Sequence, residues 1–208
     1  IIQDTNKRGL IQAMKGPPFI FLENMDKFIL GKKVKMSQIW QDEKVIPVTV
    51  VKAEPNTVSD LRNLDKHGYE AVQVSMPIGK RKILREFRSE SKEIKKGDVL
   101  DVSLFNEGDK VVISGISRGK GFQSAIKRHG FHGGPKSHGQ KDRHRAPGSL
   151  GAGGVQKVRK GLRMAGHDGL KKVSVKNLTV VKVNKEDNTL FIMGAVPGFN
   201  GSVLEIKK

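Results

Sequence analysis

The residues best suited to chemistry gather in one internal stretch, from Arg118 to Arg163. Twelve lysine and arginine residues and a single acid, Asp142, give this stretch a net charge of +11, out of +18 for the 208-residue chain. Eleven of the 24 glycines and four of the six histidines also lie here. Arginine and lysine neutralise phosphates, and glycine lets a backbone approach RNA or DNA closely. The pattern predicts a segment that binds a polyanion, with nucleic acid as the first candidate.

The cations and histidines of this stretch are the side chains expected to make the contacts. Phe122 and Phe131 are too few for a base-stacking platform, so we expect mostly backbone and shape contacts with few base-specific ones. The expected contact residues are Arg118, Lys120, Lys127, Arg128, His129, His132, Lys136, His138, Lys141, Arg143, His144, Arg145, Lys157, Arg159, Lys160 and Arg163.

The histidines admit two further interpretations, a metal site and a catalytic site. A zinc site needs cysteine or carboxylate ligands beside histidine, and the chain has no cysteine and one acid nearby, so neither a metal nor a cofactor is expected. A nuclease could use imidazoles as acid and base. No paired carboxylates and no phosphate-binding GxxxxGK[ST] loop support catalysis, so we expect no enzyme.

Composition narrows the remaining classes. Without cysteine there are no disulfides, and no apolar run is long enough to span a membrane. Three interpretations of the basic stretch stay open at this point. It is a disordered linker, part of a free-standing RNA chaperone, or part of a structural protein in a ribonucleoprotein.

The flanking segments must position the stretch, and most of them predict short strands with close turns. About seven or eight such strands favour a mainly β chain built on a small antiparallel β-barrel, with short helices elsewhere. Pro47 suggests an edge or bulge within the strand at 45–51. The strand predictions fall at 28–30, 45–51, 69–76, 99–104, 110–116, 173–183, 189–193 and 202–206.

Two short helices interrupt this pattern. At 80–88, Ile83, Leu84 and Phe87 share a helical face, so a short amphipathic helix is expected, whose basic face is either solvated or bound to phosphate. Inside the basic stretch, Phe122, Ala125 and Ile126 also have helical spacing.

Several motifs, taken in order, resemble those of the large-subunit ribosomal protein three family, the universal L-three family. Its bacterial members are similar in length to this chain. The motifs are KFILGKK at 27–33, MSQI at 36–39, VTV at 48–50, GY at 68–69, AVQ at 71–73, LREFR at 84–88, GKGFQ at 119–123, HR at 144–145, PGS at 147–149, MAG at 164–166 and GAVPG at 194–198.

The resemblance implies a β-barrel body formed by residues 25–117 and 164–208, on the outside of the large ribosomal subunit. It implies that 118–163 is an internal arm running into ribosomal RNA (rRNA) toward the peptidyl-transferase centre. Residues 1–24 match nothing in the family and are expected to be an extension. The segment expected at the arm tip, nearest that centre, is Gly148, Ser149, Leu150, Gly151, Ala152, Gly153, Gly154 and Val155.

The resemblance also implies a function. The chain is expected to be a structural constituent that binds large-subunit rRNA directly, early in assembly, and stabilises RNA near the peptidyl-transferase centre. Its expected partners are that rRNA and neighbouring large-subunit proteins, with no membrane and no homo-oligomer, in cytoplasmic ribosomes of bacterial type. A glutamine that some bacterial members methylate near the arm tip is missing from 152–155, so that modification is not expected.

Overall fold

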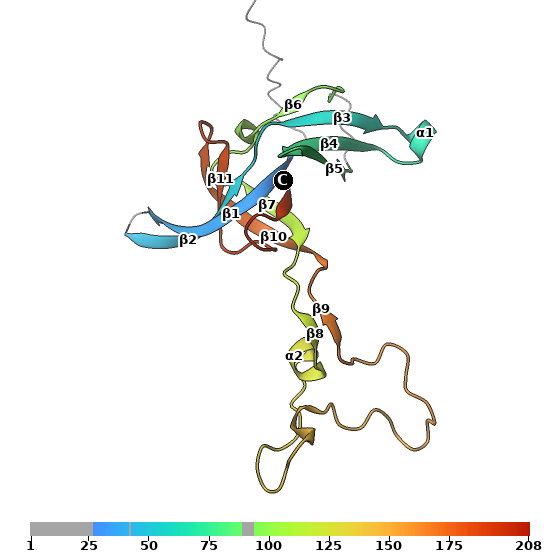
Figure 1. Ribbon diagram of the computed structural model, residues 1–208. Helices are drawn as coiled ribbons and strands as arrows, with labels where there is room; N and C mark the ends of the chain where they lie inside the picture. Colours follow the sequence, from blue (N-terminus) through green and yellow to red (C-terminus); the bar gives the residue numbers. More distant parts are fainter. Residues whose placement is uncertain (1–26, 42, 89–93) are drawn as a thin grey trace, which may run out of the picture. The chain divides into compact units, whose positions relative to one another are not determined.

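The computed structural model describes residues 27–41, 43–88 and 94–208, and the expected extension over 1–24 lies outside them. The chain divides into two compact units (Figure 1). In the described part, unit 1 comprises residues 27–115 and 173–208, and unit 2 comprises residues 116–172.

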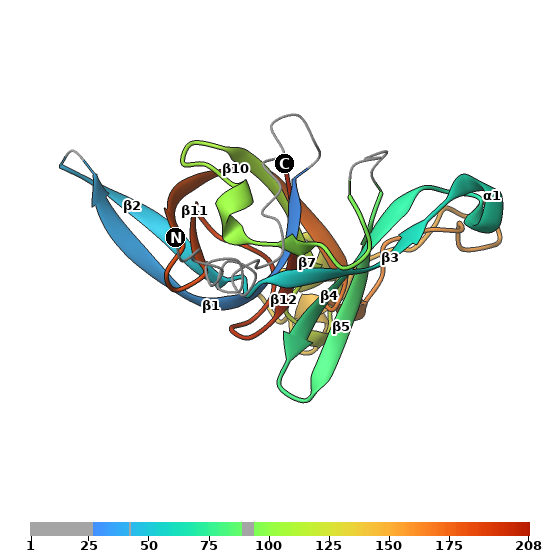
Figure 2. The ribbon, with the colours of Figure 1, turned by 90° about the horizontal axis from the view of Figure 1, so that it is seen from above.

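Six strands of unit 1 form a closed barrel. Their order around the ring is β1 (Phe28–Gln41), β12 (Val203–Lys207), β7 (Lys110–Ile116), β10 (Lys172–Asn184), β11 (Thr189–Met193) and β2 (Lys44–Lys52). Strand β1 pairs antiparallel with both β12 and β2 (Figure 2). Alternate residues point inward, and the core includes Ile29, Ile113, Leu190 and Leu204, each with no exposed surface. The expectation of a mainly β chain with an antiparallel barrel is confirmed.

The other strands of unit 1 form a second sheet. Its order is β5 (Arg81–Phe87), β4 (Ala71–Ile78), β3 (Asn56–Arg62) and β6 (Val99–Leu100), and a one-turn helix α1 (Leu64–His67) joins β3 to β4. Strand β1 serves two cores because its side chains alternate between faces. Ile29 packs in the barrel, whereas Phe28 and Leu30 pack with Val74 of β4 and Phe87 of β5.

The helix expected at 80–88 is wrong, because residues 81–87 form strand β5. Seven consecutive residues of β5 pair with β4, from Arg81 opposite Ile78 to Phe87 opposite Val72. In a strand, Ile83 and Phe87 share one face while Leu84 points to the other. Phe87 is buried against Phe28, with the ring centroids 4.6 Å apart. The free energy gained from this long-range contact outweighs the local preference for a helix that the spacing suggests.

Two further expectations, for the strand at 99–104 and for Pro47, can be compared with the structure. The strand expected at 99–104 is shorter: β6 ends at Leu100, and a 3₁₀ turn follows at Val102–Leu104, capped by the Asp101 carboxylate, which accepts from the Val102 N–H. Pro47, where an edge or bulge was expected, lies in β2 at the end of its ladder pairing with β11, and its carbonyl accepts from the Gly194 N–H at 2.9 Å. Pro47 lies opposite Gln38 of β1, just beyond Val48, where the pairing of β2 with β11 begins.

Unit 2 has short elements and almost no core. Strand β8 (Gly121–Gln123) pairs with β9 (Gly166–Asp168), and two short helical segments, α2 (Ala125–His129) and the 3₁₀ turn η2 (Arg143–Arg145), lie between them in sequence. Of the helical trio expected from spacing, Ala125 and Ile126 lie in α2 while Phe122 belongs to β8. Ala125 is the one fully buried residue of residues 116–172.

Candidate nucleic-acid interface

A two-stranded stem organises unit 2. Beyond the β8–β9 pairing, the Ser117 N–H donates to the Lys171 carbonyl and the Lys120 N–H to the Asp168 carbonyl, both at 2.9 Å. The Lys120 ammonium also lies 3.0 Å from the Asp168 carboxylate. The hydrogen bond from Lys120 lowers the pKa of Asp168 below its ordinary value. One of the two acids of this unit is therefore used to close the stem.

Helix α2 closes the stem at its other end. The Arg128 guanidinium donates to the Met164 carbonyl at 3.1 Å, and His129 Nε2 lies 3.2 Å from the same oxygen. A Cβ at Gly166 would lie only 2.6 Å from the Arg128 guanidinium, so a larger residue there would displace this side chain. Residues 130–163 therefore form an excursion that leaves and returns at one point.

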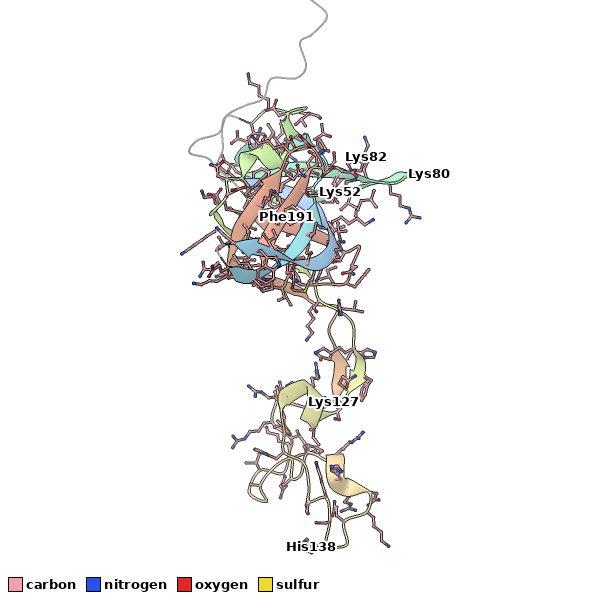
Figure 3. All side chains as sticks on the ribbon, turned by 90° about the vertical axis from the view of Figure 1, so that its left-hand side faces the viewer. Lys52, Lys80, Lys82, Lys127, His138 and Phe191 are labelled. Carbon is pink, nitrogen blue, oxygen red and sulfur yellow. The ribbon has the colours of Figure 1, made fainter. Side chains whose placement is uncertain are left out.

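The first part of that excursion is a closed loop. The Gly134 N–H donates to the His144 carbonyl at 2.9 Å, which joins the two ends of the loop 134–144. Gly133 adopts a positive φ of 77°, and a Cβ there would lie 2.5 Å from the same carbonyl oxygen. Figure 3 shows Lys127 on α2 and His138 at the far end of this loop. The loop thus presents a basic surface built on close backbone approach.

The second part of the excursion, residues 146–163, is a chain of turns. Residues 148–155 are all exposed and none is charged. Their internal contacts are local: the Ser149 hydroxyl donates to the Gly151 carbonyl at 2.8 Å, and the Val155 N–H donates to the Ala152 carbonyl at 3.1 Å. The charged residues stand on either side of this uncharged segment, at 143–145 and 157–163.

The structure brings every expected contact residue into unit 2, in two settings. Arg128, His129 and His144 are half-buried, and the first two hold Met164. Those that are exposed are Arg118, Lys120, Lys127, His132, Lys136, His138, Lys141, Arg143, Arg145, Lys157, Arg159, Lys160 and Arg163.

Residues after Arg163 belong to the same unit but were not among those expected. His167 meets Phe122 edge-on, with ring centroids 5.9 Å apart, and Lys171 and Lys172 lie on the return segment. With them, unit 2 carries fourteen lysine and arginine residues against two acids, a net charge of +12. A three-residue strand such as β9 is too short for periodicity to reveal, so only the pairing with β8 identifies these residues.

Neither a cluster of metal ligands nor a membrane-spanning helix occurs in the described residues. Within 27–41, 43–88 and 94–208, no three histidine or acidic side chains come together as metal ligands would. No helix among these residues is long and apolar enough to cross a membrane.

Unit 1 holds a polar cluster of its own, centred on Glu86. Its carboxylate accepts from Tyr69 at 2.9 Å, Arg62 at 3.0 Å and Gln73 at 3.2 Å. The bonds from Tyr69 and Arg62 lower the pKa of Glu86, and the bond to Glu86 raises the pKa of Tyr69. The three donors come from β3, β4 and the segment between them. The cluster therefore ties β5 to its neighbours.

An antiparallel barrel interrupted in sequence by a glycine-rich unit of net charge +12 defines a basic structural protein of the nucleic-acid-associated class. The family model of ribosomal protein L3 matches residues 73–197, more than half of the chain. The chain belongs to the ribosomal protein L3 family. It is therefore a structural constituent of the large ribosomal subunit, active in translation, and not an enzyme.

Bacterial relatives agree with this assignment over most of the chain. The large ribosomal subunit protein uL3 of Herpetosiphon aurantiacus is 41% identical over 201 residues, which covers 86% of this chain and 95% of the relative. The same protein of Deinococcus radiodurans is 41% identical over 201 residues (87% and 94%). That of Carboxydothermus hydrogenoformans is 43% identical over 205 residues (88% and 98%). The family resemblance seen in the sequence motifs is confirmed.

Proposed function

We propose that unit 2 is the rRNA-binding arm of this protein. It binds large-subunit rRNA directly and early in subunit assembly, in cytoplasmic ribosomes of bacterial type. The observation that carries this proposal is the combination of a net charge of +12 with a single buried residue across 57 residues. A segment that buries so little apolar surface gains little from packing on itself, so its ordered contacts come from a polyanion.

The geometry suits contacts to the RNA backbone rather than to base edges. The exposed cations are spread along both parts of the excursion, and the glycines at 133 and 134 bring backbone close to backbone. Phosphate contacts of this kind position a protein without reading sequence. Recognition by unit 2 therefore depends on the folded shape of the rRNA.

The uncharged segment 148–155 takes a different part in this proposal. Its residues cannot supply acid–base chemistry, because none of them titrates in the physiological range. They stabilise the nucleotides near the peptidyl-transferase centre by contact alone, while the flanking cations hold the chain to phosphate. Neighbouring large-subunit proteins complete the set of partners, without a membrane and without a second copy of this chain.

The test of direct rRNA binding is the salt dependence of affinity. With about 6–10 phosphates neutralised, the dissociation constant for large-subunit rRNA fragments should rise about 10³- to 10⁵-fold between 50 and 200 mM salt. A nearly flat salt dependence would show that unit 2 does not bind the RNA backbone.

A wash experiment separates a subunit constituent from a free-standing RNA chaperone. The protein should stay with large subunits that are sedimented after a high-salt wash. Its release by that wash, with the subunits otherwise intact, would favour the chaperone.

A further inference from the structure

Unit 1 has a small hollow between the barrel and the β4–β5 hairpin. Its barrel side is made by Lys32 of β1, Lys52 of β2 and Glu54, and its hairpin side by residues 76–79. Lys32 and Lys52 lie opposite each other in the β1–β2 pairing, which places both ammonium groups at the same wall. The hollow is therefore built by residues from two separate sheets.

The register of the hairpin adds a third cation. Arg81 pairs with Ile78, and Arg85 pairs with Val74, so the two arginines share the sheet face on which Met76 and Val74 pack against the barrel. The Arg85 guanidinium lies 3.2 Å from the Glu205 carboxylate of β12, which confirms that this face meets the barrel. Arg81 therefore stands on the hollow's side of the hairpin.

Charge at the mouth of the hollow is strongly positive. The hairpin tip presents three consecutive cations, Lys80, Arg81 and Lys82, all exposed and without an ion pair to any acid of the described residues. Together with Lys32 and Lys52 they make five positive charges against one negative charge, Glu54. Figure 3 shows Lys80 at the hairpin tip, with Lys82 and Lys52 nearer the barrel.

The size of the hollow limits what it receives. Its volume is about 110 Å³, whereas a site for a whole small molecule takes roughly 300–1,000 Å³. A single tetrahedral anion fits such a space, with the apolar floor of Met76 and Ile78 beside it. Gly79 lines the hollow with a positive φ of 57° and adds no side chain to it.

We propose that this hollow is a second RNA-binding site, which seats one backbone phosphate of large-subunit rRNA between Lys32, Lys52 and Arg81. Lys80 and Lys82 contact the phosphates on either side of it. The inference rests on the proposed rRNA binding and extends it from unit 2 to unit 1. Glu54, whose carboxylate lies 3.2 Å from the Lys52 ammonium, holds Lys52 at the mouth in the free protein and is displaced by the phosphate.

The experiment compares salt slopes for a large-subunit rRNA transcript. Each phosphate contact contributes about 0.7–0.9 to the slope of log affinity against log salt. Lys52 and Arg81 act on the same phosphate, so Lys52→Gln and Arg81→Gln should each lower the slope by up to that amount, and the double variant should not lower it by more. The matched control is Lys66→Gln in α1, which removes the same charge from unit 1 at the opposite end of β4 from the hairpin tip and should leave the slope unchanged. Unaltered thermal unfolding shows that each variant is folded.

A variant that should strengthen RNA binding makes the test specific. Glu54→Gln frees Lys52 and removes the repelling charge, so the transcript should bind more tightly, by about 1.5- to 5-fold if the exposed pair is worth what such pairs usually are. Wild-type slopes for both cation variants, or weaker binding by Glu54→Gln, would overturn the site.

A comparison with unit 2 separates this inference from the proposed function. A combined Arg143, Arg145, Arg159 and Lys160 to Ala variant is measured on the same transcript. If it lowers the slope while the hollow variants do not, rRNA binding stands and the hollow is not a phosphate site. If neither set changes the slope, both proposals are wrong.

Discussion

At the scale of single residues, unit 2 divides its polar groups between holding its own stem and facing outward. Lys120 and Asp168 pair across the stem, and Arg128 and His129 hold the Met164 carbonyl. Cations of the same basic stretch therefore differ in whether they contact other groups of unit 2. Because the Lys120 and Arg128 side chains have internal partners, we expect them to support the proposed rRNA binding chiefly by keeping the stem closed.

The titration of Asp168 tests this internal role. The hydrogen bond from Lys120 holds the pKa of Asp168 below its ordinary value of 3.8. A lowered folded pKa means that the pair stabilises the stem above the unfolded pKa and that this stabilisation is lost as pH falls through the folded pKa. In an NMR titration of the free protein, Lys120→Gln should raise the pKa of Asp168 toward 3.8. Lys127→Gln, on α2, should leave it unchanged, and equal shifts in both variants would contradict the pairing.

At the scale of elements, strand β5 shows how a long-range partner decides between two local structures. In a helix, Leu84 and Phe87 would lie on one face. In the strand, Phe87 is buried against Phe28 while Leu84 is 46% exposed on the opposite face. The two side chains therefore differ in what they contribute to stability.

Truncating each of these side chains measures that difference. Phe87→Ala should lower the free energy of unfolding by roughly 3–5 kcal/mol, because it leaves a cavity against Phe28. Leu84→Ala, the matched control, should change it by no more than about 0.5 kcal/mol. Chemical denaturation of both variants measures the two values. Similar losses would mean that Leu84 and Phe87 share a face, as they would in a helix.

The excursion of unit 2 makes a second prediction at this scale. Changes to its uncharged segment and to its flanking cations should affect different steps, translation in the first case and subunit assembly in the second. Deleting residues 148–155 should leave rRNA binding and subunit yield largely intact and alter elongation or sensitivity to drugs that bind the peptidyl-transferase centre. Ala at Arg143, Arg145, Arg159 and Lys160 should impair assembly first, because phosphate contacts dominate affinity.

Subunit yield and translation rate, measured in both variants, test whether the two segments have separate roles. A tip deletion that blocks assembly as severely as the charge variant would contradict the division between the two segments.

At the scale of the whole molecule, the two units differ in what holds them together. Unit 1 has two apolar cores that share strand β1, whereas unit 2 has one buried residue and a stem held by hydrogen bonds and the Lys120–Asp168 ion pair. Local opening follows the number of buried apolar contacts. Unit 2 should therefore open far more readily than unit 1 in the free protein.

Limited proteolysis measures this difference in local opening. Trypsin should cleave first within residues 118–163 of the free protein and leave the strands of unit 1 intact. Addition of rRNA fragments should slow that cleavage, because bound RNA orders the arm. Early cuts in the barrel strands, or a resistant arm in the free protein, would contradict it.

The sequence by itself determined the chemistry of this protein and most of its strands. Charge, glycine content and the absence of cysteine are local properties, and strands such as β10, β11 and β12 follow from runs of alternating or β-branched residues bounded by turns. The family motifs can also be recognised from the sequence alone. The candidate contact residues could therefore be named in advance, although their partners could not.

Only the tertiary structure decided matters that depend on distant partners. Strand β5 exists because β4 and Phe28 complete it, and the stem of unit 2 exists because Lys120 meets Asp168 from 48 positions away. The hollow joins Lys32 and Lys52 of the barrel to residues 76–79 of the hairpin, a grouping that no spacing in the chain predicts. The free energy of strand pairing and side-chain packing depends on residues that are distant in sequence. The sequence pattern therefore shows which residues can pair, and the fold determines which residues they contact.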